Sequence, residues 1–125
     1  METKVNFKGG VVFLTLCDFT DETEAEEVIY CVENIFAKAK PPIAALVFLD
    51  CYRGSTTKTR FLVGEFLKNK MDQVSKIAFV GSKNKPFEIA TMVVMALSGF
   101  HNFKFFTSEK SALAWVKVPA AELVR

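Results

Sequence analysis

The chain has 125 residues, of which 50% are hydrophobic and 24% are charged, and its net charge is +2. This length fits a single domain, residues 1–125, and this composition is that of a folded globular protein, which excludes disorder. Basic residues form no run or stripe, no apolar run reaches 18 residues and no signal-peptide pattern opens the chain, so we expect no nucleic acid, no membrane span and no secretion.

Short strand-like runs alternate with helix-like stretches along the chain. In chain order the residues predict strands at 4–8 and 11–17, a helix at 21–39, a strand at 43–49, a helix at 56–70, a strand at 76–80, a helix at 86–98, a strand at 103–106 and a helix at 108–116. Gly9-Gly10 indicates a tight hairpin between the first two strands. The later strands are each followed by a helix, which is typical of βαβ units. The fold class is therefore α/β, in the order β-β-α-β-α-β-α-β-α, with an N-terminal hairpin and a mostly parallel five-stranded sheet.

Local signals mark where the helices begin and end. The expected N-caps are Thr20 or Asp21, Ser55 or Thr56, and Ser108, and Gly99 is the expected stop of the third helix. Residues 50–54 are expected to form a loop between the third strand and the second helix.

The strands are apolar on both sides, which raises the question of what covers them. If the parallel strands pair in chain order, right-handed crossovers place every crossover helix on one face. Yet Val12 and Leu14 point one way while Val11 and Phe13 point the other, so both faces must be buried. We expect the tail, a partner subunit or a ligand to cover the second face.

The second half of the chain resembles a known family. Residues 76–81 (KIAFVG), 103–106 (FKFF) and 109–116 (EKSALAWV) are similar to the ending of the SpoIIAA-like branch of the STAS domains, related to the bacterial anti-sigma-factor antagonists. The resemblance implies a SpoIIAA-like (STAS) fold and a non-enzymatic role in protein interaction or regulation. The same group resembles the Sec14 lipid-binding fold, which implies an alternative role in carrying or sensing an apolar molecule.

One segment departs from the family pattern. Antagonist STAS proteins carry an Asp-Ser-Ser/Thr-Gly segment that is phosphorylated at the start of the second helix, whereas residues 50–57 here read DCYRGSTT. We therefore expect no obligate phosphoswitch. The polar candidates at these strand ends are Asp50, Ser55 and Thr56, whose hydroxyls either accept phosphate or simply cap the helix.

Other candidate groups have ordinary structural interpretations. Cys17 and Cys51 at strand ends form either a thiol site or two passive buried residues, and Cys31 is expected to be passive and packed, so that its truncation leaves a small cavity. His101 is expected in a surface turn. Residues 81–85 (GSKNK) form either an anion-binding loop or an ordinary connection. The sequence assigns no catalytic, metal-binding or cofactor-binding residue.

The helix from Phe87 to Leu97 has almost no polar face. A helix that is apolar all round is buried on both sides, so Phe87, Met92 and Met95 are expected to contact a second subunit, another protein or an apolar lipid-like ligand, unless neighbouring helices and the tail cover them. The leading hypothesis is a cytoplasmic, self-associating interaction module, with a homodimer as the simplest assembly and no cofactor. An enzymatic role for Cys51 and Asp50 ranks last, because no base or oxyanion arrangement accompanies them.

Overall fold

The structure is a computed structural model that describes residues 4–40, 42–70, 72–81, 91–92, 94–96 and 98–117. Its elements, in chain order, are β1 (Lys4–Lys8), β2 (Val11–Thr20), α1 (Glu22–Lys38), β3 (Ile43–Ser55), α2 (Thr57–Lys70), β4 (Val74–Val80), β5 (Phe103–Phe106) and α4 (Glu109–Lys117). Residues 91, 92, 94–96 and 98, between β4 and β5, are helical and are called the third helix below. The predicted element order is confirmed.

The five strands form one sheet in the order β1-β2-β3-β4-β5. β1 and β2 pair antiparallel, and the other three pairings are parallel. The hairpin turn has positive φ at both Gly9 (59°) and Gly10 (80°), which is the backbone that a two-residue turn of this kind requires. The mixed, mostly parallel sheet expected from the sequence is therefore confirmed.

The helix boundaries follow their local signals. Asp21 caps α1, because its carboxylate accepts the Glu24 backbone N–H at 2.9 Å. Ser108 caps α4 by accepting the backbone N–H of Ser111 at 3.2 Å. Gly99 follows the third helix with a φ of 78°, and its N–H donates to the Met95 carbonyl at 3.1 Å.

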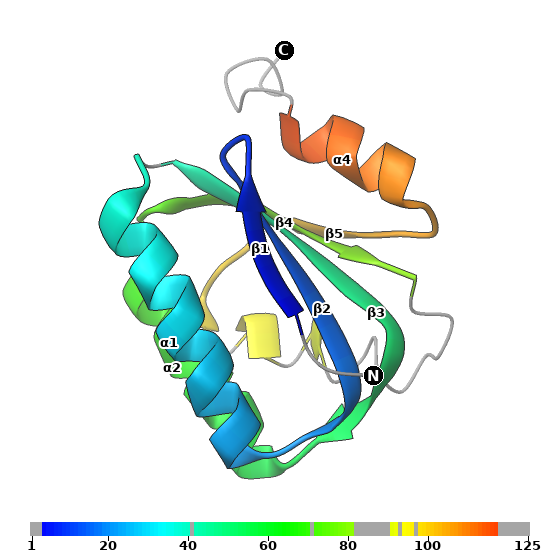
Figure 1. The fold of residues 1–125 in the computed structure, drawn as a ribbon. Helices are drawn as coiled ribbons and strands as arrows, with labels where there is room; N and C mark the ends of the chain where they lie inside the picture. Colours follow the sequence, from blue (N-terminus) through cyan, green and yellow to red (C-terminus); the bar gives the residue numbers. More distant parts are fainter. Residues whose placement is uncertain are drawn as a thin grey trace.

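Two strands are longer than the sequence predicts. β3 continues to Ser55, so the expectation of a loop at residues 50–54 is wrong, and β2 runs to Thr20 instead of ending near Cys17. These added residues pair with each other beyond the point where β4 ends, from Cys17 opposite Cys51 to Thr20 opposite Ser55. The backbone hydrogen bonds of this pairing come from residues far apart in sequence, so local propensity did not reveal them. Figure 1 shows β2 and β3 curving together toward the helix starts.

Helices cover both faces of the sheet. α1, α2 and the third helix lie on one face, as the chain-order pairing requires, while α4 lies on the other (Figure 1). On that second face, Ala112 and Val116 of α4 pack with Leu46 and Ala78 in one buried cluster. The expected cover by a tail, partner or ligand is thus supplied by the last helix, which follows the final strand and is free of any crossover constraint.

A buried lysine fixes α4 to the sheet. Lys76 of β4 is 1% exposed, and its Nζ donates to the Trp115 carbonyl at 2.8 Å. The same Nζ lies 5.0 Å from the centroid of the Trp115 ring. Trp115 is in the last turn of α4, where the carbonyls lack helical partners and the helix dipole favours a cation. This contact therefore satisfies the end of α4 and sets its position over the sheet.

Candidate functional site

Thr56, at the junction of β3 and α2, is the best-defined polar group near the strand ends. Its Oγ1 accepts the Thr59 backbone N–H at 3.1 Å, which is the contact of an N-cap. Thr56 Oγ1 also lies 2.9 Å from Glu22 Oε1 and 2.9 Å from Thr59 Oγ1. Because a carboxylate can only accept, the Thr56 hydroxyl donates to Glu22, and Thr59 supplies the proton between the two hydroxyls.

This arrangement joins the starts of two neighbouring helices. Glu22 is the first residue of α1, so its carboxylate stands beside the N-terminus of α2. A negative charge is already present where a phosphate on Thr56 would have to lie, and like charges repel. The other two polar candidates, Asp50 and Ser55, belong to β3, but their side chains lie outside the described residues. The geometry therefore matches helix capping.

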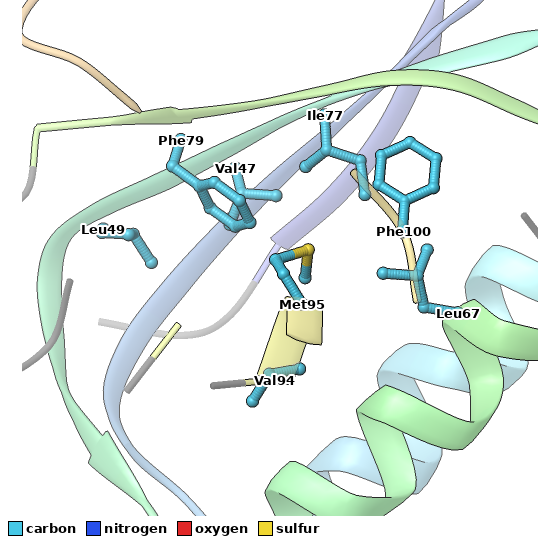
Figure 2. Close-up of a cluster of buried hydrophobic side chains, with 8 residues drawn as sticks. All are labelled: Val47, Leu49, Leu67, Ile77, Phe79, Val94, Met95 and Phe100. Carbon is cyan, nitrogen blue, oxygen red and sulfur yellow. The ribbon is translucent and has the colours of Figure 1, made fainter. Parts of the chain in front are cut away.

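The two described apolar candidates of the third helix, Met92 and Met95, differ in exposure. Met95 is 4% exposed and belongs to a core cluster with Val47 and Ile77, whereas Met92 is 50% exposed. Figure 2 shows the Met95 side chain pointing from the third helix toward the strands that carry Val47 and Ile77. Phe87 lies outside the described residues. The buried position leaves Met95 no surface to offer a second subunit, so of the two described candidates Met92 is the one that retains such a surface.

An apolar cavity of about 200 Å³ lies between the sheet and the three helices of its first face. Side chains of β2, β3, β4, α1, α2 and the third helix line it. Representative lining residues are Val12, Val32, Val47, Leu67, Phe79 and Met95. Among the described residues that line it, only Thr59, Arg60 and Thr91 carry polar side chains. Sequence reasoning missed this cavity, because a pattern of apolar residues does not tell whether their side chains fill the space between elements.

The structure places the remaining sequence candidates at separate points of the chain. Cys17 and Cys51 are register partners on β2 and β3, so the expectation that these residues are neighbours is confirmed at the backbone. Cys31 is an exposed free thiol, and the expectation that it is packed is wrong because it lies on the outer side of α1. His101 is exposed in the turn before β5, as predicted. Of residues 81–85, all but Gly81 lie outside the described residues.

The described residues contain neither a metal-ligand cluster nor a membrane-spanning helix. No group of three or more His, Cys, Asp or Glu side chains there is placed to hold a metal ion. Within the same residues, no helix has both the length and the apolar character needed to cross a bilayer.

Comparisons with known proteins agree on the fold. A family model described as SpoIIAA-like matches residues 12–117. An uncharacterized protein of the DUF3478 family from Shewanella loihica PV-4, whose crystal structure has a SpoIIAA-like fold, superposes with a TM-score of 0.72 at 19% identity, covering 92% of each chain. The anti-sigma factor antagonist SpoIIAA in its unphosphorylated form superposes with a TM-score of 0.65 at 8% identity, covering 94% of this chain and 100% of that one. No curated protein matches the chain.

Proposed function

Because the chain belongs to the SpoIIAA-like family, we propose that it is a non-enzymatic protein-interaction or regulatory module that works without a phosphoswitch. The observation that carries this proposal is the Thr56 hydroxyl, which caps α2 and donates to the Glu22 carboxylate. A residue that holds two helix starts together is a poor site for reversible modification. Phosphate on Thr56 would break its hydrogen bonds to Glu22 and to the Thr59 backbone N–H, and the phosphate would lie against the Glu22 carboxylate. The exposed free thiol of Cys31 supports a reducing, cytoplasmic location.

The proposal that the protein works without phosphorylation is tested by mass spectrometry. The protein is isolated from its native host and its intact mass is measured, followed by fragmentation across residues 50–60. The expected result is an unmodified chain. A stoichiometric phosphate on Ser55, Thr56 or Thr57 contradicts the proposal.

We further propose that the module self-associates through the outer side of the third helix. Met92 supports this choice, because half of a large apolar side chain remains in contact with water there while Met95, three residues later, is buried. A homodimer that covers Met92 removes this surface from solvent, which is favourable by roughly 25 cal/mol for each Å² of apolar area.

Sedimentation velocity tests this assembly on three proteins. Wild type is expected to be a dimer, Met92→Lys a folded monomer, and the control Tyr30→Lys a dimer, because Tyr30 is also exposed but lies on α1. A monomeric wild type, or a Met92→Lys variant that still dimerises, overturns the proposed interface.

A second candidate function is the carrying or sensing of an apolar small molecule. The cavity favours it, because about 200 Å³ of almost wholly apolar space is more than the few small voids of a well-packed domain. The test is heteronuclear NMR of the labelled protein titrated with 1-octanol. Shifts confined to residues around the cavity are expected, and an unchanged spectrum at saturating 1-octanol excludes this candidate.

A further inference from the structure

β1 forms one edge of the sheet. It is the end strand in the order β1-β2-β3-β4-β5, and among the described residues no strand pairs with its outer side. An edge strand presents backbone N–H and C=O groups with which a strand of another chain can pair. The outer edge of β1 is therefore a place where the sheet can be extended.

The hydrogen-bond pattern shows which backbone groups of β1 point outward. The Gly10 carbonyl, just before β2, accepts the Ala44 N–H of β3 at 3.2 Å. Because backbone groups alternate in direction along a strand, the even-numbered residues at the start of β2 face β3 and the odd-numbered ones face β1. These odd-numbered residues stand opposite the even-numbered residues of β1. The N–H and C=O groups of Val5 and Phe7 therefore point to the outer edge.

The side chains of β1 divide between the two faces of the sheet. Val5 packs against a cluster that contains Val32 and Phe36 of α1, and Phe7, two residues later, shares this face. The polar and basic residues of the strand alternate with these two and lie on the opposite face, where all three are exposed: Lys4, Asn6 and Lys8.

A surface pocket of about 220 Å³ adjoins Phe7 on the face of α1. Its lining comes from Phe7 and from the last turns and C-cap of α1, namely Asn34, Ile35, Lys38 and Ala39. Phe7 is 41% exposed, so its ring is open to a further contact. Since a cavity of about 150 Å³ holds a benzene molecule, this pocket has room for one large apolar side chain of an added strand.

The charges of β1 restrict the strand that can pair with it. Lys4 and Lys8 lie on one face of the strand, each next to the place of a side chain from an added strand. Acidic side chains at these two places form favourable cross-strand pairs, whereas lysines there repel. A second copy of this edge, paired antiparallel in matching register, places Lys4 opposite Lys8, so self-pairing is disfavoured. Lys38 adds positive charge beside Phe7.

We propose that β1 binds an extended acidic segment of another protein, which joins the five-stranded sheet as an additional edge strand. The segment has the pattern acidic-apolar-polar-apolar-acidic, with its acids opposite Lys4 and Lys8 and its apolar side chains beside Val5 and Phe7. This inference rests on the proposed interaction function, since it names the kind of partner. It does not depend on self-association through Met92.

The test titrates the isotope-labelled full chain with two end-capped peptides, SEVTLES and its lysine counterpart SKVTLKS, at low salt and is followed by NMR. The acidic peptide is expected to shift the amide signals of β1 and of the second half of α1, and to slow hydrogen exchange at the N–H groups of Val5 and Phe7. It is expected to bind at least tenfold more tightly than the lysine peptide. This advantage is expected to shrink in about 0.5 M NaCl, because salt screens exposed charges.

Charge reversal on the edge strand tests the pairing directly. The double variant Lys4→Glu with Lys8→Glu is expected to reverse the preference and to bind SKVTLKS more tightly than SEVTLES. The matched control Lys58→Glu with Lys68→Glu makes the same change of charge at two exposed positions of α2 and is expected to keep the preference of wild type.

A proline tests the role of the backbone. Phe7→Pro and Phe7→Ala both remove the ring, but only proline also removes the outward N–H, which an edge strand tolerates. Phe7→Pro is therefore expected to weaken SEVTLES several-fold more than Phe7→Ala does. Equal losses in the two variants contradict pairing through the backbone and overturn the inference.

Three other results also overturn the inference. They are equal binding of the two peptides by wild type, a reversed preference in the α2 control, and amide shifts that leave β1 unchanged. If neither peptide binds, Lys4 and Lys8 serve only to guard the edge, and the inference fails. The proposed interaction function is judged separately, by the intact mass and by sedimentation, so its failure is distinguishable from this one.

Discussion

At the scale of single residues, Thr56 makes one contact that the sequence predicts and another that it does not. The sequence predicts a cap at Ser55 or Thr56, because a hydroxyl before an apolar helix is a local signal. Its second contact, with Glu22, joins residues 34 positions apart, and no local pattern announces it. The capping role was therefore predictable, but the link between the two helix starts was not.

Thr56→Ala tests the importance of this hydroxyl for stability. The variant loses the N-cap of α2 and the bond to Glu22, so its free energy of unfolding is expected to fall by about 1–2 kcal/mol. Urea denaturation followed by circular dichroism measures the change. Thr56→Ser, which keeps the hydroxyl, serves as the control and is expected to lose less than half as much. Equal losses in both variants would show that the methyl group matters more than the hydroxyl.

Cys31 gives a second prediction at this scale. Because the thiol is exposed on α1, Cys31→Ala creates no cavity, and its free energy of unfolding is expected to stay within about 0.5 kcal/mol of wild type. The same substitution is expected to remove one rapidly alkylated thiol from the native protein, as counted by mass spectrometry after brief iodoacetamide treatment. A loss of stability above this range, or an unchanged alkylation count, refutes the exposed position.

At the scale of elements, the sequence predicted those features that short spacings determine. The hairpin at Gly9-Gly10, the Asp21 cap and the Gly99 stop all depend on neighbours within a few residues. The extension of β3 to Ser55 depends instead on pairing with β2. The covering of the second face by α4 depends on the direction that the chain takes after the last strand. Non-local pairing and unconstrained connections are the two reasons why these features escaped sequence reasoning.

The covering role of α4 is tested by two alanines two positions apart. Ala112 is fully buried against the sheet and Ala114 is exposed. Ala112→Glu places a charge in the buried cluster, so a loss of more than about 3 kcal/mol is expected, whereas Ala114→Glu is expected to stay within about 0.5 kcal/mol. Thermal and urea unfolding of both variants provide the measurement. Similar stabilities for the two would mean that α4 does not pack on the sheet.

The third helix offers a comparable pair. Met95→Ala removes a buried side chain and enlarges the cavity, so the free energy of unfolding is expected to fall by about 2–5 kcal/mol. Met92→Ala truncates a half-exposed side chain and is expected to cost less than about 1 kcal/mol in the monomer. Unfolding curves taken at low protein concentration separate this effect from any contribution of dimerisation. A larger loss for Met92 than for Met95 would reverse the assignment of the two faces.

At the scale of the whole molecule, the arrangement of layers was predictable in outline and the cavity was not. Strand order and crossover handedness place three helices on one face without knowledge of any side chain. The cavity results from how the side chains of β2, β3, β4 and the three helices on that face meet, and such packing is decided by shape. The apolar character of the chain was visible in its 13 phenylalanines, but the volume left unfilled was not.

The position of α4 in the chain also affects synthesis. All five strands precede α4 in the chain, so Phe13, Phe48 and Val80 on the second face of the sheet are synthesised before the helix that covers them. Until α4 packs, these side chains present an apolar surface to water, which favours aggregation. A chain that lacks α4 is therefore expected to aggregate more readily than one that contains it, because Ala112 and Val116 no longer cover this face.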